Sequence, residues 1–328
     1  MLGAPADHTG TPIVARSEAV RAAAAVLGDL GQCDVRIGPL TTYRVGGRAA
    51  LFVRIGHLDD LAVLASAVHA SGLPVLVLGR GSNLLVADAG FEGIVVSTAA
   101  VTDGFDIDDS SGIVRAGASV ALPVLARQTA ARALTGFEWA VGVPGSIGGA
   151  VRMNAGGHGS DMAASLVDVV VADLDAPDAS VADVLPAAAL GLRFRGSSLG
   201  PRRIVLEATL QLANGDRTAS EATIGEIVAW RRANQPGGQN AGSVFVNPVP
   251  GEVSAGALID QLGLRGTRMG SAQVSDKHAN FIQADDGGSA DDVYALMEFV
   301  QRKVAEGTGH VLRSEIRLLG YPPIGSAD

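Results

Sequence analysis

Two glycine-rich stretches hold the residue types that suit an anionic cofactor. The longer one covers residues 135–159, with glycines at 136, 142, 145, 148, 149, 156, 157 and 159. So many glycines would weaken a helix or a strand, but they leave backbone N–H groups free to approach a phosphate closely. Apolar residues such as Phe137 and Trp139 are out of place in a solvated linker. We therefore interpret the stretch as a packed nucleotide cradle, although it lacks the spacing of the two common phosphate loops.

The shorter stretch is Gly79, Arg80, Gly81, Ser82 and Asn83, directly after an apolar segment at 74–78 that is typical of a buried strand. Its two glycines allow a tight turn, and its serine and asparagine offer hydrogen-bond partners. Alone it fits an ordinary β-turn better than a binding loop. When the cradle at 142–149 is considered with it, the binding loop becomes the favoured interpretation, because a long cofactor with two phosphates needs two such turns.

Ser243 is the candidate proton donor. It stands next to Gly242 and ahead of the apolar pair Val244 and Phe245, and no G-x-S-x-G elbow surrounds it, so a triad hydrolase is poorly supported. The ordinary interpretation is a serine in a turn. The alternative is a hydroxyl that delivers a proton when the charge it leaves behind is compensated. Asn247, four residues later, is able to bind a base or a phosphate.

Charged residues gather near the C-terminus. If residues 312–318 form a strand, Arg313, Glu315 and Arg317 share one face of it. Such a face is usually a solvated edge; the alternative is a polar active-site wall in which an arginine holds Glu315. Arg195, in a polar run of its own, is ambiguous in the same way.

A further polar run at 273–281 precedes an apolar segment. A surface loop is the default interpretation of such a run. The sharper alternative is an anion pocket that uses Lys277 and His278.

The length, composition and net charge of the chain exclude several classes of function. The chain has 328 residues, of which 47% are apolar and 18% charged, so two or three domains with sizeable cores are expected. A net charge of −9 argues against a protein that binds nucleic acid or an anionic membrane. Cys33 is the single cysteine and the histidines are scattered, so neither a disulfide nor a metal site is expected. Because no signal-like start and no apolar stretch of membrane-spanning length is seen, we expect a cytoplasmic protein.

Apolar periodicity and turn residues predict a chain of mixed helices and strands. Helices are expected at 17–30, 57–71, 119–134, 221–232, 255–262 and 291–306, the third capped by Ser119 and the last by Ser289. Strands are expected at 50–55, 74–78, 93–97, 113–116, 166–174, 203–212, 278–283 and 311–319. The first dozen residues are expected to be a loose tail, and the polar run at 213–220 is expected to separate two domains.

Taken in chain order, these motifs resemble those of the UDP-N-acetylenolpyruvoylglucosamine reductase family of flavoenzymes. The matching pieces lie at 42–47, 79–83, 143–150, 153–156, 240–243, 247–248 and 270–281, with Glu315 and its flanking strand. No single motif is decisive, but together they span nearly the whole chain beyond residue 35 in the family's order. The short passage between Arg195 and Arg203 resembles the subtype that lacks an extra loop with a substrate-capping tyrosine.

The resemblance implies an α+β fold with two domains. Residues 1–34 would form an N-terminal tail and helix, 35–215 an FAD-binding domain of the vanillyl-alcohol-oxidase type with two α+β subdomains, 216–322 a smaller C-terminal α+β domain that binds substrate, and 323–328 a tail. This fold holds an extended FAD between its subdomains. It is not a Rossmann fold, which is consistent with the missing G-x-G-x-x-G.

The resemblance also implies the ligands. FAD would be held through Gly79, Arg80, Gly81, Ser82, Asn83, Gly142, Val143, Pro144, Gly145, Ser146, Gly148, Gly149, Ala150, Asn154 and Gly156. Some relatives of this fold attach FAD covalently through histidine or cysteine; only His158 stands near these turns, so noncovalent FAD is expected. NADPH would be the hydride donor. The UDP-sugar substrate would be bound by Asn247, Arg265, Lys277 and His278.

The implied reaction converts UDP-N-acetylglucosamine enolpyruvate to UDP-N-acetylmuramate in peptidoglycan biosynthesis, through two half-reactions at one site. NADPH first reduces the flavin and leaves, and the reduced flavin then delivers hydride to C3 of the enolpyruvyl group. Arg195 and Glu315 match the family's pair that stabilises the enolate-like charge on C2 and the carboxylate. Ser243 matches the acid that protonates C2.

Phe194 is the main departure from the family's pattern, because a tyrosine usually precedes the arginine. Phe194 keeps the ring and loses the hydroxyl; since Arg195, Ser243 and Glu315 are all present, we expect activity to survive with altered efficiency. Two alternatives stay open: an FAD-linked sugar or alcohol oxidase on the same fold, and a catalytically impaired nucleotide-binding homologue. No dimerisation signal is visible, so a monomer is expected.

Overall fold

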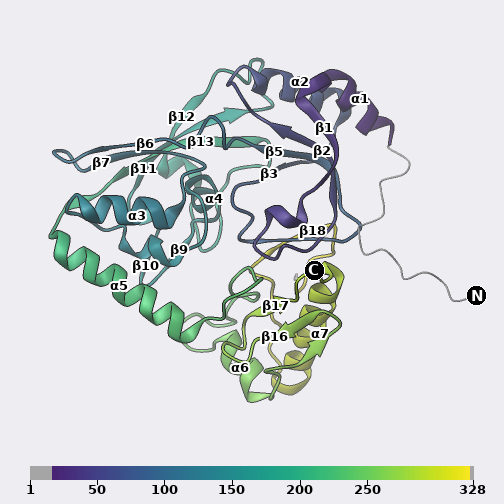
Figure 1. Cartoon of the computed structure of the whole chain (residues 1–328), viewed down its shortest axis with the longest axis vertical. Coiled ribbons are helices and arrows are strands. Elements are labelled where there is room, and N and C mark those ends of the chain that lie inside the picture. The colour runs from purple at the N-terminus through teal and green to yellow at the C-terminus, as the bar shows by residue number, and fades with distance from the viewer. Residues whose placement is uncertain (1–16, 326–328) are drawn as a thin grey trace, which may run out of the picture.

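The structure, a computed structural model, describes residues 17–325, so the tail expected over the first dozen residues and the last three residues of the chain lie outside the described part. Three groups of helices and strands are visible in Figure 1. Two of them, in the upper part of the view, are built around sheets, and the third, at the lower right, holds the C-terminal part of the chain. The expected mixture of helices and strands is confirmed.

The first group is a four-stranded sheet with two helices packed against it. The strand order is β1 (Gly31–Arg36), β2 (Arg48–Arg54), β5 (Phe91–Ser97) and β3 (Val75–Val77), with β1 antiparallel to β2 and the other pairs parallel. The helices are α1 (Glu18–Leu27) and α2 (Asp60–Ser71), and both bury apolar side chains in one core with the sheet. α2 ends at Gly72, whose φ of 67° is a left-handed conformation that glycine adopts without strain.

The second group is a five-stranded antiparallel sheet with helices packed against it. The strand order is β12 (Asp183–Pro186), β11 (Leu166–Asp173), β13 (Arg203–Gln211), β7 (Ile113–Gly117) and β6 (Phe105–Asp108). The helices are α3 (Leu122–Ala131), α4 (Ile147–Met153), α5 (Arg217–Asn234) and the 3₁₀ turn η3 (Glu138–Gly142). Phe137 and Trp139 are buried in this core and meet edge to face, with 5.4 Å between ring centroids. The glycine-rich cradle is therefore packed, as its apolar residues predict.

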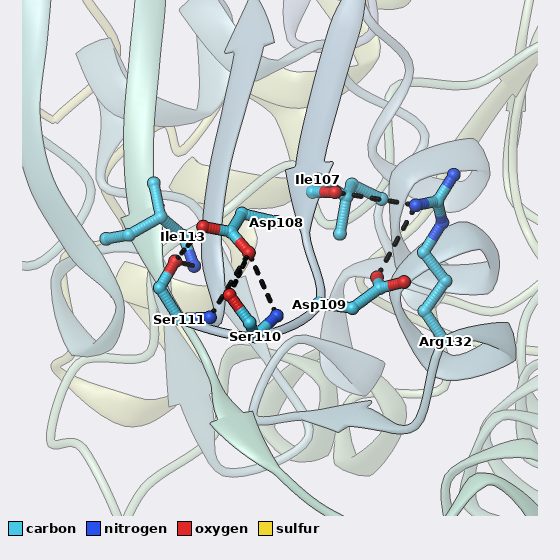
Figure 2. A network of polar contacts seen from close by, with 7 residues as sticks. All are labelled: Ile107, Asp108, Asp109, Ser110, Ser111, Ile113 and Arg132. Atoms are coloured by element: carbon cyan, nitrogen blue, oxygen red, sulfur yellow. Dashed lines mark hydrogen bonds and ion pairs between the residues drawn. The ribbon is translucent and has the colours of Figure 1, made fainter.

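A tight turn joins β6 to β7 at the outer end of this sheet (Figure 2). The Asp108 carboxylate accepts hydrogen bonds from the backbone N–H and the hydroxyl of Ser110, and from the same two groups of Ser111, at 2.6 to 3.3 Å. These bonds favour the charged carboxylate and hold the pKa of Asp108 well below its usual range. Arg132, just after α3, pairs with Asp109 at 3.4 Å. Side chains therefore fix both flanks of the turn.

The third group is the C-terminal domain. Its three-stranded antiparallel sheet has the order β15 (Arg268–Met269), β16 (Ala272–Val274) and β17 (Ile282–Ala284), and its helices are α6 (Ala255–Gln261) and α7 (Ala290–Thr308). The prediction for α7 is confirmed: Ser289 is the N-cap, and the apolar stripe is buried, namely Val293, Leu296, Met297, Val300 and Val304.

A parallel strand pair joins the C-terminal domain to the first group. It consists of β4 (Leu84–Val86), which follows the shorter glycine stretch, and β18 (Arg317–Leu319). Leu85 and Tyr43 are buried in the core of the C-terminal domain. The Tyr43 hydroxyl donates to the Ile282 carbonyl at 3.1 Å. The two domains therefore share a core and do not merely touch.

Shorter elements complete the described part of the chain. They are β8 (Leu134–Thr135) paired with β14 (Ala213–Asn214), β9 (Gly156–Gly157) paired with β10 (Ser160–Asp161), and the 3₁₀ turns η1 (Gly28–Leu30), η2 (Gly38–Leu40), η4 (Met162–Ala164) and η5 (Ala187–Leu190). Between residues 17 and 325, no helix combines the length and the apolar character needed to cross a membrane.

Several element predictions are wrong in their bounds or caps. Ser119 does not cap α3, which begins at Leu122; its hydroxyl bonds to Thr102 at 2.7 Å instead. The strand expected at 278–283 begins only with β17, because the preceding residues form a turn. The strand expected at 311–319 is regular only over β18, because residues 313–315 pair with residues 244–246 instead.

α5 is longer than predicted, and although it follows the expected domain boundary it packs on the FAD-binding side of it. It begins at Arg217, capped by Asp216, instead of at 221. Its buried residues Ile224 and Ile227 belong to the core of the second group. We therefore propose that the FAD-binding domain extends to about residue 234, where α5 ends, instead of stopping at 215.

Candidate active site

A cavity of about 310 Å³ lies where the three groups meet. It is lined by β3, both glycine-rich stretches, α4, the end of α5, residues 240–243, Phe281, Glu315 and Arg317. Its size falls in the range of roughly 300–1,000 Å³ that small-molecule sites occupy. Segments far apart in the sequence therefore form one site.

Most of the residues predicted to bind the cofactor line this cavity. They are Gly79, Arg80, Gly81, Ser82, Asn83, Gly142, Val143, Pro144, Gly145, Ser146, Gly149, Ala150 and Gly156. Gly148 and Asn154 do not line it. The Gly148 N–H donates to the Ala118 carbonyl at 2.8 Å, and the Asn154 side chain bonds to Asp161 and to the Ala163 N–H at the end of α4. These two residues therefore support the segment that forms the cavity wall but do not line the cavity themselves.

The two glycine-rich stretches approach each other so closely that side chains would not fit between them. A Cβ on Gly79 would lie 2.6 Å from the Ser146 hydroxyl oxygen. Gly81 has a φ of +60°, and a Cβ there would lie 2.6 Å from the Thr41 Cα. Gly81 is therefore required by its backbone geometry, and Gly79 is the point of closest approach between the two stretches. A narrow cleft with bare backbone on two sides fits an extended dinucleotide such as FAD.

The cavity is positively charged although the chain as a whole carries −9. Five arginines line it, and Glu315 is the only acidic residue among the lining residues; the arginines are Arg80, Arg152, Arg195, Arg231 and Arg317. Burial, and then the nearby Arg317, lower the pKa of Arg152, and burial lowers that of Arg231. Guanidinium groups stay charged despite such shifts. The site therefore favours ligands with several negative charges, such as nucleotides with a diphosphate.

Arg195 and Glu315 form an ion pair in the cavity wall. The Arg195 Nε donates to Glu315 Oε1 at 2.6 Å, and Arg195 Nη2 donates to the Gly156 carbonyl at 3.2 Å. The side chains are 31% and 17% exposed, so the pair is partly shielded but reachable by a ligand. The Arg195 guanidinium also lies over the Phe194 ring, 4.9 Å from its centroid. The sequence left open whether an arginine holds Glu315, and in the structure Arg195 does so.

Backbone hydrogen bonds place Ser243 next to this pair. The Glu315 N–H donates to the Val244 carbonyl at 2.9 Å, and the Val246 N–H donates to the Arg313 carbonyl at 2.9 Å. Ser243 lines the cavity one residue before this ladder. Gly242, at a φ of 82°, turns the chain so that Ser243 reaches the wall. A cation, a carboxylate and a hydroxyl therefore face one cavity.

The four residues predicted to bind the UDP-sugar do not line the cavity. Asn247 accepts from the Ala255 N–H at the start of α6, and Lys277 donates to a backbone carbonyl at the end of α5. Arg265 pairs with Asp260, and His278 accepts from the Asn280 N–H and packs against Phe281. Their substrate role stays a prediction that the cavity geometry does not support.

Several lining residues were missed by sequence reasoning, among them the polar residues Arg152, Arg231 and Gln235. Arg231 stands in the predicted helix at 221–232, where an arginine is normally assigned to the solvated face. Arg152 stands on α4, which was not predicted as a helix because the stretch at 135–159 was interpreted as a cradle. The signal that could have found Arg231 is the end of the helix at Gln235 and Pro236, since a helix terminus often borders a site.

The lining residues include no histidine or cysteine. His158, the residue weighed for covalent attachment, is exposed and stands edge to face with Trp230, 5.3 Å between centroids. Within residues 17–325 there is also no group of three or more His, Cys, Asp or Glu side chains that could hold a metal ion.

Comparison with known proteins assigns both parts of the chain. Residues 49–173 match an FAD binding domain family, and residues 234–319 match the family described as UDP-N-acetylenolpyruvoylglucosamine reductase, C-terminal domain. Fold and site thus define an FAD-dependent oxidoreductase of the vanillyl-alcohol-oxidase type with an added α+β domain, which confirms the predicted fold class and cofactor.

Individual relatives narrow the assignment. The UDP-N-acetylenolpyruvoylglucosamine reductase of Acaryochloris marina is 37% identical over 302 residues, which is 90% of this chain and 96% of that protein. That of Gloeobacter violaceus is 41% identical over 292 residues, 88% and 96% of the two chains. The crystal structure of the reductase from Thermus caldophilus has a TM-score of 0.73 at 32% identity and covers 88% of this chain and 98% of its own. The chain belongs to the UDP-N-acetylenolpyruvoylglucosamine reductase family.

Proposed function

We propose that this chain is an NADPH-dependent flavoenzyme that reduces UDP-N-acetylglucosamine enolpyruvate to UDP-N-acetylmuramate in peptidoglycan biosynthesis. The observation that carries the proposal is the cavity that places Arg195, Glu315 and Ser243 beside the two glycine-rich stretches. Family membership supports the same reaction, because relatives over most of the chain carry the name of this reductase.

The glycine-rich stretches would hold FAD without a covalent bond. Backbone around Gly79 and Gly81 lies on one side of the cleft and the segment 142–146 on the other, and Arg80 adds positive charge for the pyrophosphate. Bound FAD supplies the redox chemistry, taking two electrons from NADPH and passing them to the enolpyruvyl double bond. Noncovalent binding is supported by the absence of histidine and cysteine among the lining residues.

Arg195 and Glu315 would stabilise the charge that develops on the substrate. Reduction at C3 leaves negative charge at C2 and on the neighbouring carboxylate. The guanidinium of Arg195 supplies fixed positive charge in a partly shielded site, where such charge acts more strongly than in water. Glu315 holds that guanidinium in place through the 2.6 Å bond to Nε.

Ser243 would complete the reaction by giving its proton to C2. A serine hydroxyl is a weak acid, so it needs positive charge nearby to stabilise the alkoxide that it leaves. The five arginines of the cavity supply that charge. Solvent then reprotonates the hydroxyl.

Phe194 does not favour the impaired homologue over the active reductase. Its ring supports the Arg195 guanidinium at 4.9 Å without a hydroxyl, so the contact that the ring makes is retained. The oxidase alternative has no use for a proton donor next to an arginine–carboxylate pair. Neither alternative is favoured by a specific observation.

The proposal includes a single-chain enzyme in the cytoplasm, where NADPH and UDP-sugars are found.

An anaerobic experiment with the two half-reactions tests the function. The purified protein should be yellow, and NADPH should bleach its flavin absorbance. Addition of UDP-N-acetylglucosamine enolpyruvate should then restore the colour, whereas simple sugars or alcohols should not. Reoxidation by neither compound would refute the proposal, and reduction of the flavin by a sugar or alcohol would favour the oxidase.

A further inference from the structure

A contact remote from the cavity ties the start of α7 to the FAD-binding domain. Asp88 lies just after β4, and its carboxylate accepts from the Ser289 hydroxyl at 2.5 Å and from the N–H groups of Ala290 and Asp291 at 3.1 and 3.2 Å. In return, the Asp88 N–H donates to the Asp291 carboxylate at 3.2 Å. A residue of one domain thus satisfies N–H groups that the first turn of a helix in the other domain leaves without a helical partner.

Tyr321 extends this contact. Its hydroxyl donates to the Asp291 carboxylate at 2.5 Å, and its ring stacks on Tyr294 of α7 with 4.3 Å between centroids. Burial, and then the Asp291 carboxylate, raise the pKa of Tyr321, so its hydroxyl remains a donor at neutral pH. The α7 latch is defined here as Asp88, Ser289, Ala290, Asp291 and Tyr321.

Two parallel strands connect the α7 latch to the active site. β4 leads from the shorter glycine stretch to Asp88, and β18 leads from Glu315 toward Tyr321. At the cavity end of this pair, the Arg317 N–H donates to the Asn83 carbonyl at 2.9 Å. Each strand has three residues, so the two ends of the pair lie roughly 10 Å apart.

The start of α7 also has a cap of its own. The Ser289 hydroxyl accepts from the Asp292 N–H at 3.2 Å, and Asp292 accepts from Ser271 in the same domain. Asp88 is the member of the α7 latch that comes from the other domain. Its contact therefore does more than cap a helix: it adds a side-chain link between the two domains beside the β4–β18 pair.

We infer that Asp88 is a positioning residue for Glu315. The α7 latch sets where the far end of β18 lies against β4, and three residues of strand carry that placement to Glu315 at the near end. Placement matters at this scale, because a shift of about 1 Å can cost roughly 100-fold in rate. The inference rests on the proposed function, since it concerns the half-reaction in which Glu315 acts.

The test compares the two half-reactions in the FAD-loaded enzyme. Asp88→Ala should slow reoxidation of the reduced flavin by UDP-N-acetylglucosamine enolpyruvate about tenfold or more, while reduction by saturating NADPH stays within about threefold of wild type. Asp88→Asn, whose amide oxygen still accepts N–H bonds, should give an intermediate rate of reoxidation. If Asp88→Ala does not fold, the comparison uses Asp88→Asn and Tyr321→Phe.

Asp216→Ala is the matched control. Asp216 caps α5 in the same way, accepting from the Ala219 N–H at 2.8 Å, but α5 packs against α3 and η3. The control should lower the melting temperature without a selective loss of reoxidation. Equal losses in both half-reactions of the Asp88 variants, or no loss in either, would overturn the inference. Failure of the proposed function would look different, because the wild-type flavin itself would not be reoxidised by the sugar nucleotide.

Discussion

Arg195 and Glu315 meet in the cavity wall although 120 residues separate them in the chain. A tight turn presents Arg195, and the bond from the Glu315 N–H to the Val244 carbonyl holds Glu315 beside the segment that carries Ser243. The backbone positions of the proposed charge stabiliser and the proposed proton donor are thus fixed by hydrogen bonds. At the scale of single residues, this separation of roles makes the two half-reactions respond differently to substitution.

Ser243→Ala should block the second half-reaction selectively. Flavin reduction by NADPH needs no proton from this hydroxyl and should stay close to wild type. Reoxidation by the enolpyruvyl substrate should fall by about 10²–10⁴-fold, the usual contribution of a positioned general acid. Stopped-flow absorbance of the flavin measures both rates, and an equal loss in both would contradict the proton-donor role.

Glu315→Gln should also slow reoxidation more than reduction. Glutamine keeps the shape of the side chain and can still accept from Arg195, but a bond to a neutral acceptor is about half as strong as one to a carboxylate. A loss of about 1.4 kcal/mol corresponds to roughly tenfold in rate. Glu298→Gln, an exposed position on α7, is the control. Unchanged turnover of Glu315→Gln would argue against its assigned role.

At the scale of elements, short pieces of chain depend on local contacts, which are backbone pairing for β4 and β18 and polar side chains for the turn between β6 and β7. β4 and β18 have three residues each, and the turn between β6 and β7 depends on one carboxylate with four donors. A long helix such as α7 carries its stability in its buried stripe. The turn between β6 and β7 should therefore respond to pH.

Asp108→Asn should make the protein less stable at neutral pH. It should also reduce the loss of stability that occurs as the pH falls into the acid range. The pKa of Asp108 is lower in the folded state than in the unfolded state, because four donors favour its charged form. Its contribution is therefore present above the unfolded pKa of about 4 and is lost as pH falls through the folded value. The difference in melting temperature between variant and wild type should narrow below pH ~4. Asp106→Asn, an exposed position on the same strand, is the control; a difference that stays constant with pH would contradict the expectation.

At the scale of the whole molecule, charge is distributed unevenly. The chain carries −9, yet five arginines meet in the cavity. A cavity of opposite sign to the surface that surrounds it concentrates field lines at its mouth and raises the capture rate of anions. Binding of NADPH should therefore depend on this local field and not on the net charge.

Salt should slow the capture of NADPH without slowing the chemistry. Raising the ionic strength from about 0.01 to 1 M shortens the Debye length from about 30 to 3 Å, and the rate of flavin reduction at limiting NADPH should fall by about tenfold or more. The rate at saturating NADPH should change little. Arg231→Gln should weaken the salt dependence, whereas Arg302→Gln on α7 should not. A rate at limiting NADPH that is independent of salt would show that the arginines do not steer the ligand.

Sequence reasoning identified the parts of the site whose local pattern has one physical explanation. The two glycine-rich stretches are of this kind, because most of their residues line the cavity and a Cβ at Gly79, Gly81 or Gly148 would lie less than 3 Å from a neighbouring atom. Residue roles that depend on long-range pairing were harder to see. The regular strand expected at 311–319 does not form, since residues 313–315 pair with 244–246, a register that no local pattern encodes. Arg152 and Arg231 line the cavity but were not predicted as site residues. Asn247 accepts from the first N–H of α6, and its ligand role stays a prediction.

Arg195 stands on a backbone with a φ of 53°, in the left-handed region. That conformation costs a residue with a Cβ roughly 1 kcal/mol or more relative to glycine. Selection for heat resistance alone would therefore favour glycine at position 195. Variants selected in this way would lack the guanidinium that pairs with Glu315. Stability-guided redesign of this enzyme should keep Arg195, because a substitution that relieves the backbone strain there would also remove a residue proposed to act in catalysis.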